Sequence, residues 1–326
     1  MVIYFILEGK KNMKIILKTI AIILIALISF DCVFATINIS DNEYVNKNGI
    51  HMNQEDLNRL YNLGFTDSEI SIMQKDEFKD NLKVDGVVVA RTTKYYKTLV
   101  MPEKSSSALS MNSNFNLKSI TYEISENEYN SADSQVSVYG NSNGYTETNY
   151  KKMTSSIIKT GNVYRYKNDL TWKKIPSTRS YDIIGIGIDS TVSGISSSKY
   201  FKMIYDIENT SNLSCKRYSS TSGRWELNSS GYAVTFKLPE DTDTLKLYTL
   251  SSHMYFDVQK LTSVTIKTLN AYGDYKHAQR RVDSTVGGQI SIGTSGINFD
   301  VSVSAAVVES YDSITTAQAT WSGLNW

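Results

Sequence analysis

The chain has 326 residues, and its 34 basic and 33 acidic side chains give a formal net charge of +1 at pH 7. Because binding to a phosphate backbone needs a concentrated basic surface, this balance argues against a nucleic acid as the partner. The chain contains 22 tyrosines but only 3 prolines and 2 cysteines, a composition that favours β structure without a disulfide framework.

Residues 13–35 form the first recognisable segment, and their order of residue types predicts a secretory signal peptide. Lys14 and Lys18 supply its basic start, and residues 19–30 supply its apolar stretch. This stretch is shorter than the roughly 20 residues that a membrane-spanning helix needs. The sequence therefore predicts no stable transmembrane anchor.

Cleavage of the signal is expected between Ala35 and Thr36, after the small side chain that a signal peptidase requires. Met13 would begin a signal of ordinary length, so the residues before it are either an over-extended start or an unusually long basic region. Cleavage leaves Cys215 as the single cysteine, which excludes an internal disulfide. The sequence therefore predicts a secreted, extracellular protein, and export without disulfides is more typical of a Gram-positive bacterium than of a eukaryotic cell.

Residues 53–78 follow a polar leader and predict two short helices. Asn53 can cap the first helix, and Gly64 can end it. Thr66 and Glu69 have the spacing of a capping box at the start of the second helix. The apolar residues expected to pack between the two helices are Leu57, Leu60, Leu63, Phe65, Ile70 and Met73.

The segment from Leu63 to Ile70, with the pattern LGFT-x-x-E-I, resembles the helical pair that precedes β-rich regions in uncharacterised secreted proteins of Gram-positive bacteria. This resemblance implies export and carries no known activity. The expected organisation is a signal peptide (1–35), a polar leader with the helical pair (36–82), a β segment with a linker (83–116) and a β-sandwich domain (117–326).

From Leu117 onward, short runs of β-branched and aromatic residues alternate with clusters of turn residues. Residues 151–160 are the exception, because their composition favours a short helix. The remaining runs show no helical period. The sequence therefore predicts a mainly β protein, an antiparallel two-sheet sandwich or jelly roll, preceded by a short two-helix segment.

The sequence contains no motif for metal binding or for nucleophilic catalysis. His51, His253 and His277 are the only histidines, and none belongs to a paired arrangement such as HExxH. Cys215 lies in a polar stretch and has the features of a structural cysteine. We therefore predict no metal ligand, no cofactor and no catalytic residue.

Residues 169–189 carry a group of side chains that is typical of surfaces binding sugars or peptides. The group consists of Trp172, Arg179, Tyr181 and Asp182. The structural alternative is a crossover between strands, in which Trp172 fills the sandwich and Arg179 pairs with Asp182.

Residues 271–283 add a second candidate group, because Tyr275 and His277 share one face if this segment is a strand. His277 could then contact a ligand or serve as a base. The alternative is that it is a packed residue of the core.

Together these features favour a surface or extracellular binding module whose partner is a cell-surface carbohydrate or a protein. The first alternative is a secreted hydrolase acting on a cell-wall polymer or glycan, with carboxylates such as Glu123, Glu126 and Glu128. The second is a β-hairpin pore-forming or antibacterial toxin. Residues 290–308 suggest it because apolar and small polar side chains alternate there, as in membrane-inserting strands.

Overall fold

A computed structural model describes residues 43–102, 117–132, 147–207, 213–217, 225–241, 247–261, 263, 265–279, 290–295, 298–303, 311, 312, 314 and 316–326. The chain divides into two compact units, 1–44 and 45–326, and the account below concerns the second. The predicted signal peptide, its cleavage point between Ala35 and Thr36, and the linker residues 103–116 lie outside the described residues.

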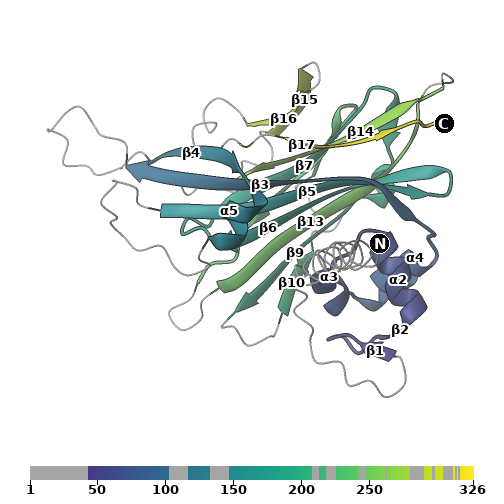
Figure 1. Ribbon diagram of the computed structural model, residues 1–326, viewed down its shortest axis with the longest axis horizontal. Helices are drawn as coiled ribbons and strands as arrows, with labels where there is room; N and C mark the ends of the chain where they lie inside the picture. The colour runs from purple at the N-terminus through teal and green to yellow at the C-terminus, as the bar shows by residue number, and fades with distance from the viewer. Residues whose placement is uncertain are drawn as a thin grey trace, which may run out of the picture. The chain divides into compact units, whose positions relative to one another are not determined.

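The described residues form a mainly β structure with two large sheets and two small two-stranded ones, which confirms the predicted fold class. The larger sheet contains eight strands, and Figure 1 shows its long strands running side by side. Its order is β10 (Leu213–Arg217), β9 (Tyr200–Ile207), β13 (Leu247–Lys260), β6 (Val163–Lys174), β5 (Glu147–Thr160), β3 (Val87–Pro102) and β4 (Leu117–Ile124), with β8 (Val192–Gly194) paired to β13.

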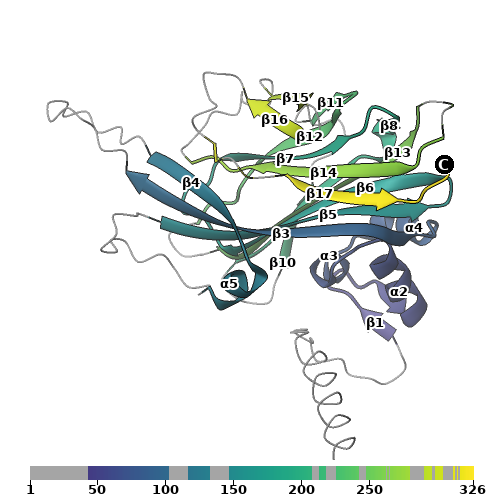
Figure 2. The same cartoon turned by 45° about the horizontal axis from the view of Figure 1, so that its top comes forward.

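The smaller sheet has five strands and lies against one face of the larger sheet (Figure 2). Its order is β11 (Trp225–Asn228), β12 (Gly231–Lys237), β7 (Tyr181–Ile188), β14 (Thr268–Lys276) and β17 (Ala317–Ser322). Every described strand pair in the two sheets is antiparallel. This arrangement is a β-sandwich.

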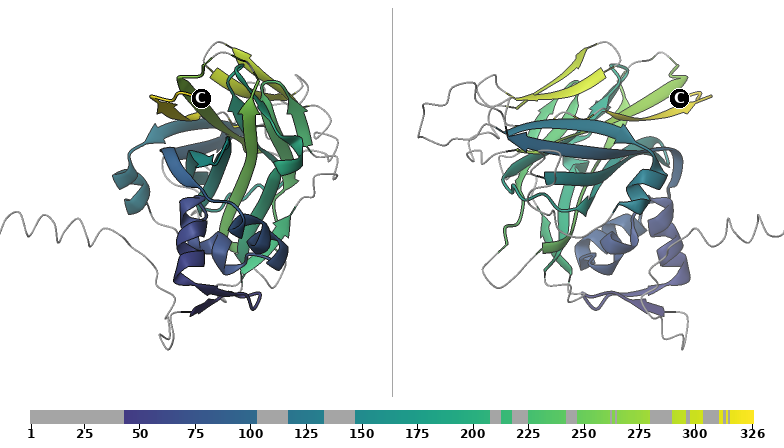
Figure 3. Two further views of the ribbon diagram at one scale, coloured as in Figure 1. Left: turned by 90° about the vertical axis from the view of Figure 1, so that its right-hand side faces the viewer. Right: turned by 60° about the vertical axis from the view of Figure 1, so that its left-hand side comes forward.

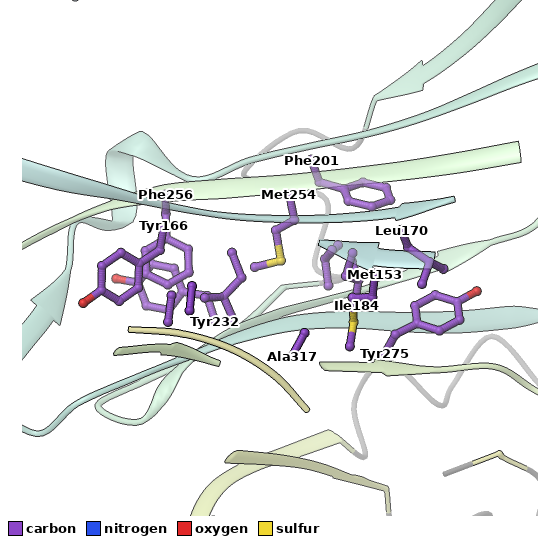
Figure 4. Packing of buried hydrophobic residues seen from close by; sticks show 14 of the residues in the cluster. Met153, Tyr166, Leu170, Ile184, Phe201, Tyr232, Met254, Phe256, Tyr275 and Ala317 are labelled. Carbon is purple, nitrogen blue, oxygen red and sulfur yellow. The ribbon is translucent and has the colours of Figure 1, made fainter. Parts of the chain in front are cut away.

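The apolar core lies between the two sheets (Figure 4). Met153 and Leu170 come from the larger sheet, and Ile184 and Tyr275 come from the smaller one; all four are completely buried. Because successive side chains of a strand point to opposite faces, each strand can give one set of residues to this core and another to the outer face.

Strand β6 shows how the outer face of the larger sheet is used. Tyr166 and Leu170 point into the core, so Arg165, Lys167 and Asp169 point to the opposite face. Lys167 and Arg165 are nevertheless buried, because helices cover this face. Figure 3 shows the helices packed there, on the side of the larger sheet that faces away from the smaller one.

The helical segment begins as the sequence predicts. Two short strands, β1 (Glu43–Val45) and β2 (His51–Asn53), precede α2 (Gln54–Asn62) and α3 (Asp67–Ser71). Asn53 caps α2 in a capping box, and Gly64 follows that helix with a φ of 79°. Thr66 and Glu69 form the predicted capping box at α3. Both helix starts are therefore confirmed.

A third helix, α4 (Lys75–Leu82), follows the predicted pair and was not expected. Its buried residues are Glu77 and Asn81, which are polar, so no apolar period marks it in the sequence. The remaining described helices are α5 (Glu126–Ser131) and the single 3₁₀ turn η1 (Ser196–Ser198). Within the described part of the chain, no helix is both long enough and apolar enough to cross a membrane.

The predicted helix over residues 151–160 is wrong, because these residues belong to β5. This strand lies between β3 and β6 and pairs with both along most of its length. Its inward residues include Lys151, Met153 and Ser155, all completely buried. Pairing with strands on both sides therefore overrides the local preference for a helix. The polar residues at buried positions hide the alternation by which a strand is recognised in the sequence.

Two glycines with positive φ angles offer a test of the packing between strands. Gly231 has a φ of 145°, and a Cβ there would lie 2.2 Å from the backbone oxygen of Ile186. Gly161 has a φ of 66° and open space around the same position. We expect Gly231→Ala to lower the free energy of unfolding by about 3 kcal/mol or more, and Gly161→Ala by about 1 kcal/mol. Urea denaturation of both variants measures the difference, and equal losses would contradict the tight approach of β12 to β7.

Candidate functional site

Four of the six predicted site residues meet inside the sandwich, in a group that we call the His277 cluster. Trp172 comes from β6, Asp182 from β7, Tyr275 from β14, and His277 follows β14. The Trp172 ring lies edge-on to His277, with 4.9 Å between ring centroids, and 6.0 Å from Tyr275. Nδ1 of His277 lies 3.0 Å from a carboxylate oxygen of Asp182, and the Tyr275 hydroxyl donates to the same carboxylate.

The His277 cluster is closed to solvent. Trp172 is 4 % exposed, Asp182 and Tyr275 are 0 % exposed, and His277 is 1 % exposed. Burial raises the pKa of Tyr275 well above its ordinary value, and the neighbouring carboxylate of Asp182 raises it further, so this residue stays a hydrogen-bond donor. The cluster therefore has the character of a buried structural network, and Trp172 offers no open surface to a ligand.

Arg179 and Tyr181 lie outside this network. The guanidinium group of Arg179 forms a two-point contact with Asp241, one bond being 3.1 Å long, so the alternative pairing with Asp182 does not form. Tyr181 is half-buried, and its backbone oxygen accepts a hydrogen bond of 2.9 Å from the Tyr311 hydroxyl. Although they are close to Trp172 in the sequence, Arg179 and Tyr181 do not join the His277 cluster.

Two further residues complete the His277 cluster and were missed by sequence reasoning. The Lys151 ammonium group contacts the Asp312 carboxylate, and both side chains are fully buried. The other oxygen of Asp312 accepts a hydrogen bond of 2.8 Å from the backbone N–H of His277. The two residues are 161 positions apart in the chain, so no local pattern could have paired them.

A second buried group lies between the helices and the outer face of the larger sheet. We call it the Glu69 cluster; its charged members are Glu69, Glu77, Lys167, Asp169, Lys202 and His253. One oxygen of Glu69 accepts hydrogen bonds from Lys167 at 3.0 Å and from the backbone N–H of Thr66 at 2.9 Å. Glu77 pairs with Lys202 at 2.9 Å. The carboxylate that caps α3 thus also fixes that helix to the sheet.

Glu69, Asp169 and His253 bring three ligand atoms within 4.8 Å of one another, which is a geometry compatible with a metal ion. The Lys167 ammonium group, however, donates hydrogen bonds to both the Glu69 and the Asp169 carboxylates. A lysine ammonium group therefore already stands where a cation would bind. The positive charge that balances Glu69 and Asp169 therefore comes from Lys167.

The surroundings of Glu69 keep it ionised. Burial alone would raise the pKa of its carboxyl group, but the positive field of His253, Lys167 and Lys202 and the Thr66 N–H hold that pKa far below its ordinary value. Asp169 and Glu77 are the acidic groups that face the same cluster. The ionised Glu69 therefore stabilises the folded state at neutral pH.

An exposed aromatic group lies on the outer face of the larger sheet, near α5. Lys97 in the middle strand β3 stands directly opposite Tyr122 on β4 and Tyr150 on β5. We call these three residues the tyrosine row. Tyr122 is 47 % exposed, and the Lys97 ammonium group lies 5.8 Å from the centre of the Tyr150 ring. Directly opposed residues share a face of the sheet, so the row crosses three strands.

The three carboxylates proposed for a hydrolase each contact a different side chain. Glu123 binds Lys94 at 2.9 Å, Glu126 accepts from the Tyr95 hydroxyl at 2.8 Å, and Glu128 binds Lys97 at 3.2 Å. Each carboxylate therefore has its own partner. Partial burial and the carboxylate of Glu126 raise the pKa of Tyr95 to about 12, so it remains a neutral phenol.

The hairpin proposed for membrane insertion is present as a separate two-stranded sheet. Strands β15 (Ile290–Ser295) and β16 (Asn298–Val303) pair so that Ile290 stands opposite Val303. Each strand has 6 described residues, whereas a membrane-spanning strand needs about 9–11. Residues 304–308 of the proposed segment lie outside the described residues.

A comparison with models of known protein families finds none that matches this chain, and a comparison with curated proteins likewise finds no match. Arguments about function therefore depend on the His277 cluster, the Glu69 cluster and the tyrosine row.

Replacing Glu69 by glutamine tests the Glu69 cluster. We expect the free energy of unfolding to fall by about 3 kcal/mol at neutral pH, because the buried Lys167 loses one of its two counter-charges. The folded-state pKa of Glu69 is lowered, so its stabilisation is complete above about pH 4.3 and is lost as the pH falls toward the folded pKa. In urea denaturation, the gap between wild type and variant should therefore shrink between about pH 5 and pH 3.

Asp80→Asn is the matched control, because Asp80 pairs with Lys83 at the surface, where the two side chains are 74 % and 73 % exposed. Its loss should cost less than about 1 kcal/mol. A gap between wild type and Glu69→Gln that does not change with pH would contradict the ionised state of Glu69.

Trp172→Ala tests whether the His277 cluster is structural. We expect a loss of about 3–5 kcal/mol in the free energy of unfolding, since the change empties a volume that no solvent reaches. Trp172→Phe keeps most of the apolar contact and should lose less. If Trp172→Ala leaves stability unchanged, the ring does not fill the sandwich.

Proposed function

We propose that this chain is an exported binding protein whose ligand is a neutral carbohydrate polymer of the cell surface. The tyrosine row carries the proposal. Tyrosine rings combine a broad apolar face with a hydroxyl group, which is the chemistry that packs against sugar rings and hydrogen-bonds their hydroxyls. The predicted signal peptide supports the same proposal, because it would place the mature chain, beginning at Thr36, where such polymers occur.

The spacing of the row favours an elongated ligand. Neighbouring strands lie about 4.8 Å apart, so the strand positions of Tyr122 and Tyr150 are about 10 Å apart, with Lys97 between them. A small molecule would touch one ring, whereas a chain of sugar units crossing the strands would touch both. A polymer is therefore the better match.

The charges of this surface favour a neutral ligand. Lys97 is balanced by Glu128. The half-buried Tyr95 adds an aromatic ring beside the row, and its ring centroid lies 5.0 Å from that of the buried Tyr129. Burial raises the pKa of Tyr129 above its ordinary range, so both phenols are uncharged. Around Lys97 the surface therefore presents uncharged phenols beside a paired lysine, which suits hydroxyl groups better than a phosphate or a carboxylate.

The double variant Tyr122→Ala/Tyr150→Ala tests this function. Purified protein is incubated with insoluble cell-wall material, and the retained fraction is measured against wall concentration. We expect the variant to bind at least about tenfold more weakly, equivalent to about 1.4 kcal/mol or more, because aromatic anchors dominate such surfaces.

Tyr248→Ala is the matched control, since Tyr248 is a 51 % exposed tyrosine on β13 outside the row. It should bind as the wild type does. Digestion of the wall material with a protease beforehand separates the two partner classes. Binding that survives digestion supports a carbohydrate, whereas binding that disappears identifies a protein partner and overturns the proposal.

A further inference from the structure

The Lys151 and Asp312 pair differs from an ordinary ion pair in being completely withdrawn from water. Both side chains are 0 % exposed and in direct contact. The Lys151 ammonium group also lies 4.8 Å from the centre of the Trp172 ring and 5.6 Å from that of Tyr275. Two aromatic rings therefore lie beside the ammonium group.

A reaction between the two groups requires the neutral forms of both partners. A charge in a dry, apolar site has lost its hydration, and the cost is avoided when the proton passes from the ammonium group to the carboxylate. The result is an amine beside a carboxylic acid. A neutral amine is a nucleophile, and a carboxylic acid carbon is an electrophile that it can attack.

We propose that Lys151 and Asp312 form an intramolecular amide bond, which cross-links the chain. After proton transfer, Nζ of Lys151 attacks Cγ of Asp312 and the N–C bond forms. The bond from Cγ to the hydroxyl oxygen then breaks, and that oxygen leaves as water with the proton that it carries and one from Nζ. No oxidant, reductant or other reactant is required.

The contacts of Asp312 suit this reaction. The oxygen on the lysine side is Oδ2, which is the one that would leave. The other oxygen, Oδ1, accepts the 2.8 Å hydrogen bond from the His277 backbone N–H. A fixed N–H donor of this kind stabilises the negative charge that develops on a carbonyl oxygen when a nucleophile adds to the carbon.

The bond would join a strand of the larger sheet to a segment that is distant in sequence and leads into the smaller sheet. Lys151 lies on β5 of the larger sheet, and Asp312 lies just before β17 of the smaller sheet. A cross-link closing so long a loop restricts the unfolded chain strongly. It would supply a covalent constraint in a mature chain whose single cysteine cannot form an internal disulfide. The proposal does not depend on the proposed ligand.

A second buried lysine provides an internal control. The Lys167 ammonium group contacts the Asp169 carboxylate, just as Lys151 contacts Asp312. Two features differ: Lys167 also contacts a second carboxylate, that of Glu69, and the Asp169 side chain is 13 % exposed. Two anions favour the charged lysine, which is not a nucleophile. Lys167 and Asp169 should therefore remain separate side chains.

Mass spectrometry of the purified, denatured protein tests the proposal. We expect an intact mass lower than the sequence mass by one water molecule, and a protease digest in which Lys151 and Asp312 occur in one branched peptide. Lys167 and Asp169 should show no such link. An intact mass equal to the sequence mass, with Lys151 and Asp312 recovered in separate peptides, would overturn the proposal.

Variants sharpen the test. Lys151→Arg should keep its full sequence mass, because a guanidinium group remains protonated and is not a nucleophile. Lys167→Arg is the matched control and should still lose one water molecule. A water loss that persists in Lys151→Arg would assign the reaction to another pair and refute this one.

Discussion

Buried lysines are the constraint on which the rest of this structure depends. The larger sheet holds Lys151, Lys167 and Lys202 at 0 % exposure. An ammonium group without a counter-charge is very costly there, so each lysine requires a carboxylate from elsewhere in the chain. The helices supply Glu69 and Glu77 on the outer face, and a distant segment supplies Asp312 on the inner face. Charge neutralisation therefore links the sandwich to its helical cover.

This constraint also fixes the register of the central strands. A shift of one residue in β6 would turn Lys167 toward the apolar core and Tyr166 toward the carboxylates of the helices. The apolar core cluster includes no residue of α2, α3 or α4, so the helices add little to it. Charge pairs therefore place the helices on the sheet together with local apolar contacts, such as that of Phe65 with Tyr255, whose ring centroids are 6.1 Å apart.

What could be predicted from the sequence was local. The caps at Asn53 and Thr66 depend on residues three positions away, and the short β runs show their own alternation. The helix α4 was missed because it buries polar residues, and β5 was misassigned for the same reason. Trp172 and His277 were recognised as unusual, but their partner Asp312 lies far along the chain. Charge pairs between distant residues leave no periodic pattern in the sequence, so only the three-dimensional structure reveals them.

The same pairing bears on where a ligand can bind. Within the described residues, the Glu69 and His277 clusters satisfy most of their charge internally and are closed to solvent, so they hold the fold together. The tyrosine row differs because its rings stand partly open, and only Lys97 within it is charged. A ligand there would meet aromatic faces without first breaking a buried ion pair. Recognition and stability thus use different side chains, and changes to the row should leave the buried charges undisturbed.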